Sequence, residues 1–112
     1  MIIATRTLYV RDASGETPVT VTMTAPFPHP KYESCLCTIR IVWPDYVSEM
    51  SIDGADAFQA LDYAQKAIGA ILYSSSYHRD GVLFADYRRG GYGFPVTPNI
   101  RDVLVGEDAV FL

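Results

Sequence analysis

The longest amphipathic pattern in the chain runs from Ile52 to Tyr73. At about 100° per residue, its apolar side chains fall on one arc and its polar side chains on the opposite side. Ser51 or Asp53 can cap the start, and Asp56 places a negative charge at the positive end of the helix dipole. The pattern therefore predicts one long helix. Its apolar arc holds Ala57, Phe58, Ala60, Leu61, Ala64, Ile68, Ile71 and Leu72.

Small residues form a seam along the predicted helix, made of Ala57, Ala60, Ala64 and Ala67. Close packing of the helix on a sheet is the favoured interpretation of this seam, and a helix–helix dimer contact is the alternative. Gly69 is expected to weaken the last turns of the helix, because glycine loses more conformational freedom on folding than other residues.

Alternating apolar and polar residues before the helix predict strands. Residues 2–10 are rich in β-branched and aromatic types, and the turn residues 11–16 close a hairpin. Residues 19–25 alternate apolar side chains with threonines, as in a sheet with one solvated face. Residues 35–43 alternate as strongly and are expected to pair with residues 19–25 and face the helix. Residues 46–52 are predicted to be an extended approach to the helix or a short edge strand.

The region after the helix is less regular. Residues 82–87 are predicted to form another strand, and residues 88–95 are predicted to form a loop rich in glycine. The tail holds two short apolar runs, residues 103–105 and 109–112, and at least one of them should pack on the core. Glu107 and Asp108, between these runs, are interpreted as a solvated turn.

These patterns together predict a single α+β domain over residues 1–112. An antiparallel sheet forms from an N-terminal meander, one long helix packs on one face of it, and a short strand region follows at the C-terminal end. At 112 residues the chain is long enough for one core without disulfides or metals.

Composition and charge narrow the classes of function. The chain is 49% hydrophobic and 20% charged, which is typical of a globular protein. The net charge of −4 argues against binding to nucleic acid or to an anionic membrane. Charged residues interrupt the helix too often for a membrane span, and the first residues do not resemble a signal peptide. Cys35 and Cys37 are best explained as reduced, buried thiols, so we expect a cytoplasmic protein.

Catalytic and metal-binding motifs are weak in this sequence. Cys35, Cys37, His29 and His78 do not have the paired spacing of a structural zinc site. The Gly-x-Ser-x-Gly motif of serine hydrolases is absent, and the run of glycines at residues 90–93 lacks the lysine and the following helix of a phosphate-binding loop. The sequence therefore predicts no catalytic residue, no metal and no cofactor.

The loop after the last predicted strand carries the candidate binding residues. Arg88, Arg89, Tyr92 and Phe94 are of the types that protein interfaces favour, although an ordinary structural loop is also consistent with them. The alternative is a small-molecule or enzyme site in a cleft between the helix and residues 88–94. Its polar groups would be Arg40, His78 and Arg88.

The segment Ile52-Asp53-Gly54-Ala55-Asp56-Ala57-Phe58-Gln59-Ala60-Leu61 resembles a motif of small bacterial domains of unknown function. In that motif an Ile-x-Gly-x-Asp-x-x-Gln-Ala-Leu helix follows a strand rich in Trp, Cys and Ile, and residues 37–41 and 91–95 also look similar. Some of these small acidic α+β proteins look like immunity proteins of bacterial toxin systems. The resemblance implies a bacterial fold of this kind.

The leading expectation is a non-catalytic binding protein that contacts a protein partner, as an immunity protein does when it neutralises a toxin. A small-molecule-binding protein or enzyme is the first alternative. A structural homodimer, formed through the alanine seam or an edge strand, is the second.

Overall fold

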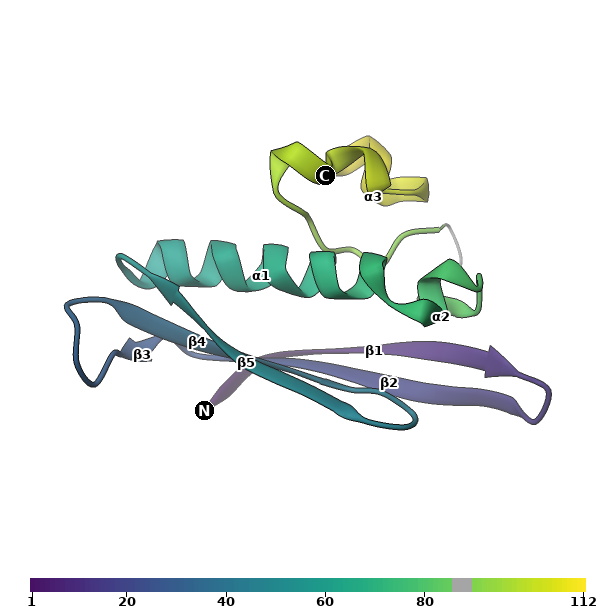
Figure 1. Ribbon diagram of the computed structural model, residues 1–112, viewed down its shortest axis with the longest axis horizontal. Coiled ribbons are helices and arrows are strands. Elements are labelled where there is room, and N and C mark those ends of the chain that lie inside the picture. The colour runs from purple at the N-terminus through teal and green to yellow at the C-terminus, as the bar shows by residue number, and fades with distance from the viewer. Residues whose placement is uncertain (86–89) are drawn as a thin grey trace.

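The computed structural model describes residues 1–85 and 90–112. A twisted antiparallel sheet forms one layer, a single long helix lies along one of its faces, and the C-terminal segment crosses the outer side of that helix (Figure 1). The opposite face of the sheet is covered by no other described element (Figure 1). This arrangement is the predicted α+β architecture.

Six strands and four helical segments make up these layers. The strands are β1 (Ile2–Asp12), β2 (Gly15–Thr24), β3 (Phe27–Pro28), β4 (Cys35–Val42), β5 (Val47–Gly54) and β6 (Leu83–Ala85). The helical segments are α1 (Ala57–Ser74), α2 (Ser76–Arg79), a 3-10 helix (Pro98–Val103) and α3 (Gly106–Phe111). Every strand pair is antiparallel, and the order across the sheet is β5-β4-β2-β1-β6, with β3 extending β2 along the edge of β4.

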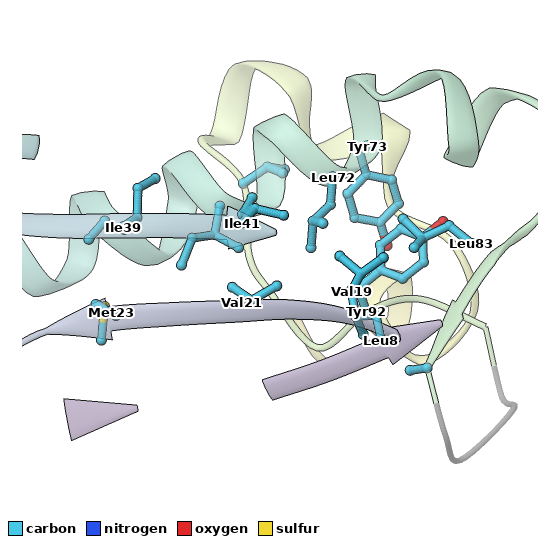
Figure 2. Packing of buried hydrophobic residues seen from close by; sticks show 14 of the residues in the cluster. Leu8, Val19, Val21, Met23, Ile39, Ile41, Leu72, Tyr73, Leu83 and Tyr92 are labelled. Carbon is cyan, nitrogen blue, oxygen red and sulfur yellow. The ribbon is translucent and has the colours of Figure 1, made fainter. Parts of the chain in front are cut away.

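The alternating apolar side chains of the N-terminal strands face the core, as predicted. The hairpin closes where Asp12 pairs with Gly15, and β2 pairs with β4 from Thr20 opposite Val42 onward. The inward side chains of these strands form a continuous apolar layer against α1 (Figure 2). Its buried members from β2, β4 and the residue after β4 are Val19, Val21, Met23, Cys37, Ile39, Ile41 and Trp43.

The start of the helix differs from the prediction. Residues 47–54 form the full edge strand β5, paired with β4 from Val42 opposite Val47 to Cys35 opposite Gly54, so α1 begins only at Ala57. Asp56 is the N-cap: its Oδ1 accepts a hydrogen bond of 2.8 Å from the Gln59 amide. The predicted caps Ser51 and Asp53 are wrong, because both lie within the strand.

The apolar arc of α1 is narrower than predicted. Ala60 and Ala64 are 0% exposed against the sheet, so these two residues of the alanine seam pack closely within one chain, whereas Ala57 is exposed and Ala67 is half-buried. Phe58, by contrast, is 84% exposed, and its predicted burial is wrong. The reason is geometric: at about 100° per residue, Phe58 lies on the same side of the helix as the exposed Gln65, at the margin of the packed arc.

The C-terminal region contains one strand and a helical tail. The strand predicted over residues 82–87 is present as β6, within the part of it that the structure describes. The tail is helical, and Leu104 is its buried apolar anchor, which confirms that one apolar run packs on the core. In the second run Ala109 is partly buried against the core, whereas Val110 and Phe111 are exposed. Among the described residues, no helix is long and apolar enough to cross a membrane.

Candidate functional site

A buried carboxylate organises the region where the C-terminal segment meets the end of α1. Asp108 is only 2% exposed and accepts three hydrogen bonds. The Tyr73 hydroxyl donates to Oδ2 at 2.6 Å, the Tyr92 amide donates to Oδ2 at 2.7 Å, and the Gly93 amide donates to Oδ1 at 2.9 Å. A buried carboxylate is tolerated when its oxygens are satisfied in this way, so Asp108 fixes the path of residues 92 and 93.

The opposite side of the same segment is fixed by Arg6 of β1. Its Nη1 donates to the carbonyl oxygens of Tyr92 and Gly93, each at 3.0 Å. Its guanidinium also lies 4.6 Å from the centre of the Phe94 ring. Residues 92–94 are therefore clamped between Asp108 of the tail and Arg6 of the sheet, although these two residues are far apart in the sequence.

Three rings pack together beside this clamp. The His78 ring lies edge-on to Tyr73 at 4.9 Å and to Tyr92 at 5.5 Å, and its Nδ1 is hydrogen-bonded to the Tyr92 hydroxyl. Figure 2 shows Tyr73 of α1 and Tyr92 of the C-terminal segment converging at the end of the core near Leu83. His78 thus joins a mostly buried aromatic cluster.

Burial changes the acidity of this cluster. It raises the pKa of Tyr92 to about 12, with the negative charge of Asp108 adding to the effect. Burial likewise raises the pKa of Tyr73, and its hydrogen bond to Asp108 contributes. Burial lowers the pKa of His78, because the charged imidazolium is poorly solvated there. At neutral pH the cluster therefore contains two protonated phenols and a neutral imidazole.

A cavity of about 390 Å³ opens next to these rings, between β6 and the C-terminal segment. We call it the His78 cavity. It is lined by Arg11, His78, Gly81, Leu83, Phe84, Ala85, Gly90, Gly91, Tyr92 and Val105. One wall is apolar, and the polar groups are an imidazole, a phenol and a guanidinium. That combination, with few polar groups around an apolar body, is typical of small-molecule sites.

A second hollow of about 140 Å³ lies between α1, β1 and β2. Its two longest polar side chains are already engaged: Arg6 binds the carbonyls of residues 92 and 93, and the Gln65 amide donates to the Leu61 carbonyl. The hydroxyls of Thr5 and Thr22 also line this hollow, but its volume is well below that of the His78 cavity. Within the described part of the chain, no group of three His, Cys, Asp or Glu residues could hold a metal ion.

The profile of a family described as a domain of unknown function (DUF6968) matches residues 4–96. The chain belongs to this family. No curated protein and no solved structure matches the chain. The DUF6968 match includes His78 and Tyr92, whereas Val105 and Asp108 lie beyond it. In this chain the carboxylate that orders the end of the DUF6968 domain is thus supplied by the tail.

The predicted site residues are only partly brought together. Tyr92 is buried and Phe94 is half-buried beneath Arg6, so neither ring is the open contact surface expected for a protein partner. Arg88 and Arg89 lie outside the residues that the structure describes. His78 lines a cavity, but that cavity lies between β6 and the C-terminal segment, whereas the ligand-site alternative expected a cleft between the long helix and residues 88–94.

Arg40 and His78 do not lie in the same site. It lies on the face of the sheet opposite α1, because it alternates with the buried Ile39 and Ile41, and it forms an exposed ion pair of 3.2 Å with Glu49. The structure therefore does not bring Arg40 and His78 into one cleft.

Sequence reasoning missed Asp108 and Arg11. Asp108 was interpreted as part of a solvated turn, and no local pattern marks a carboxylate that binds amides 15 and 16 positions earlier in the chain. Arg11 was assigned to hairpin turn chemistry. Its position on β1 next to β6 depends on a strand pairing between residues far apart in the sequence, in which Val10 lies opposite Leu83.

The lowered pKa of His78 leads to a testable pH dependence. Between its ordinary value of 6.5 and the lowered value, the unfolded chain binds a proton that the folded chain does not. His78 therefore contributes stability that is complete above the ordinary value and is lost as the pH falls through the lowered one. Tyr73 and Tyr92, whose pKa values are raised, do not titrate in this range.

We expect NMR titration to place the pKa of His78 below that of an unfolded-chain histidine. We also expect urea unfolding between neutral pH and about pH 5 to show a shallower loss of stability in His78→Gln than in the wild type, because glutamine does not titrate there. Identical pH slopes for the two proteins would contradict the buried, neutral state of this imidazole.

Proposed function

We propose that the protein is a non-catalytic binding protein whose main site is the His78 cavity. The observation that supports this most is a ring nitrogen of His78 at the wall of the cavity that is available to a ligand. His78 uses Nδ1 for Tyr92, and Nε2 has no hydrogen-bond partner among the described residues. His78 is half-buried, and Nε2 is not among the described buried atoms that lack a partner, so it is open to solvent and available to a ligand.

The size and lining of the cavity support the same proposal. Its volume is about 390 Å³. This lies near the lower end of the range of roughly 300–1,000 Å³ typical of small-molecule sites. The ring cluster, the Asp108 hydrogen bonds and the Arg6 clamp hold its walls in place, so a ligand would meet a largely preformed site.

Two matched valine variants test the proposal. Val105 lines the cavity and Val103 does not, although both side chains are well exposed in the tail. We expect a set of small aromatic and aliphatic compounds, followed by amide NMR, to include ligands that shift residues lining the cavity. Val105→Trp should abolish these shifts by filling the cavity, whereas Val103→Trp should leave them unchanged. Ligands that bind equally well to both variants would contradict the proposal.

The second candidate is a bacterial, immunity-like protein that neutralises a partner toxin. The observation that favours it is the uncovered face of the sheet, with the edge strand β5 beside it carrying the exposed Val47 (Figure 1). The net charge of −4 would suit a basic partner. Val105→Trp distinguishes the two candidates, because it fills the cavity and leaves that face of the sheet unaltered.

A further inference from the structure

The strand β5 forms one edge of the sheet. β4 pairs with it over its whole length, from Val42 opposite Val47 to Cys35 opposite Gly54, without a register shift. No other described strand pairs with β5. At the opposite edge of the sheet, β6 has only 3 residues, whereas β5 has 8. Within the described part of the chain, β5 is therefore a long strand with one unpaired side.

Alternate peptide groups of β5 point away from β4. The Trp43 amide donates to the Tyr46 carbonyl at 2.8 Å, so the peptide groups of Tyr46 face β4. Because successive residues of a strand point their N–H and C=O groups to opposite sides, every second residue after Tyr46 faces β4 as well. The residues between them face outward, where no described backbone group pairs with them. They are Val47, Glu49, Ser51 and Asp53.

β5 lacks several of the devices that usually protect an exposed edge. Natural edge strands are often short or bulged, or carry lysine or proline. The register of β5 is continuous, and the strand contains neither of these residue types. An open edge of this kind is a template on which an extended peptide can add a strand.

The charge along the edge is negative. Glu49 Oε2 lies 3.2 Å from Arg40 Nε, and both side chains are more than half exposed, at 57% and 51%, so this pair is weak. Asp53 is exposed and forms no ion pair with another described residue. Glu49 and Asp53 share one face of the strand, because they stand four positions apart. An added strand with Lys or Arg at two positions four apart would meet both carboxylates.

The other face of the edge is apolar. Met50 and Ile52 lie opposite the buried Ile39 and Cys37 of β4, on the α1 side of the sheet, and Met50 is 47% exposed. An added strand would place every second side chain beside Met50, where an apolar group would remove surface from water. The complementary segment therefore alternates basic or polar residues with apolar ones.

A second copy of this chain suits the edge poorly. β5 contains no Lys or Arg. An antiparallel pair of β5 strands would therefore bring four carboxylates onto one face of the joined sheet, and like charges on neighbouring strands are destabilising. The charge of the edge favours a basic segment from a different protein.

We propose that β5 binds an extended segment of a protein partner, which adds an antiparallel strand at the open edge. Its Lys or Arg side chains lie beside Glu49 and Asp53, and its apolar side chains lie beside Met50. This inference is independent of the His78 cavity. It adds a mode of recognition to the second candidate function, in which main-chain hydrogen bonds supply affinity and alternate side chains supply specificity.

The test uses a peptide with blocked ends, Thr-Val-Lys-Val-Thr-Val-Lys-Val-Thr, titrated into the full chain and followed by amide NMR. We expect the bound peptide to slow hydrogen exchange at the amides of Glu49, Ser51 and Asp53, and to leave those of Ser48 and Met50, which already face β4, unchanged. Methylating the backbone nitrogens of its two lysines, which would face β5, should weaken binding at least about tenfold. Methylating those of its two central valines, which would face away, should not.

Variants of the chain test the charge and the backbone separately. Asp53→Lys should weaken binding of this peptide about tenfold, and a peptide with Glu in place of the lysine opposite residue 53 should recover it. Ser51→Pro removes one outward N–H group and none that faces β4, so it should abolish peptide binding in a folded chain. Ser51→Ala is its matched control. It loses the exposed contact of the Ser51 hydroxyl with Thr38 but keeps the N–H group, and should bind normally.

Three results would overturn the proposal. The first is an affinity that does not depend on which peptide nitrogens are methylated, and the second is unchanged exchange along β5 at saturating peptide. The third is a dimer of the wild-type chain that Ser51→Pro converts to a monomer, because the edge would then belong to a second copy. All three leave the His78 cavity untouched, since the two valine variants test it separately.

Discussion

Replacing Asp108 by asparagine is expected to lower the free energy of unfolding by about 2–4 kcal/mol. The carboxylate accepts from the Tyr73 hydroxyl and from the amides of Tyr92 and Gly93. An asparagine side chain has only one oxygen, and its NH₂ group would face donors. At least one buried N–H or O–H group would therefore lose its acceptor, and hydrogen bonds to a charged group are among the stronger ones.

Asp102→Asn is the matched control for this change. It removes the same charge from the same tail, but Asp102 is exposed, so its effect should stay within about 0.5 kcal/mol. Urea unfolding measures both variants, and amide exchange at Tyr92 and Gly93 shows whether the tail has detached locally. Equal stability of the two variants, with unchanged protection of both amides, would mean that the buried carboxylate does not hold this segment.

The parts of the fold that could be predicted from sequence are those where local pattern and tertiary burial coincide. In β4, Cys37, Ile39 and Ile41 face the core because strict alternation leaves no other choice of face. The helix was predicted for the same reason. Its beginning was misplaced because the pattern of residues 52–55 is also compatible with a helix, and pairing of β5 with β4 decided in favour of a strand.

The candidate site depended on contacts that have no local signal. Arg6, His78, Tyr92 and Asp108 meet only after the C-terminal segment has crossed α1, and each is unremarkable in its own sequence neighbourhood. Tyr92 and His78 were both predicted as site residues, but for different sites, because their mutual hydrogen bond could not be foreseen. Long-range packing therefore determined the chemistry of the cavity, while alternation determined only the scaffold.

Gly69 illustrates the same distinction, and its replacement is the second large effect we expect. From sequence, this glycine only weakens a helix, and its replacement by alanine would then stabilise the protein by about 0.8–1 kcal/mol. In the structure, a Cβ at this position would lie 1.9 Å from the Pro95 carbonyl oxygen and 3.2 Å from Val96 Cγ1. Gly69 is thus the point where the C-terminal segment crosses α1 at close approach.

Gly69→Ala is therefore expected to destabilise the protein, by about 2 kcal/mol after the gain in helix propensity is included, because the obstructing atom belongs to the backbone and cannot rotate away. Ala70→Gly measures helix propensity at the next position and should lower the free energy of unfolding by about 1 kcal/mol. If propensity alone decided, the two changes would have opposite signs. Urea unfolding should instead show that both destabilise, and a stabilised Gly69→Ala variant would mean that residues 95 and 96 do not rest on α1.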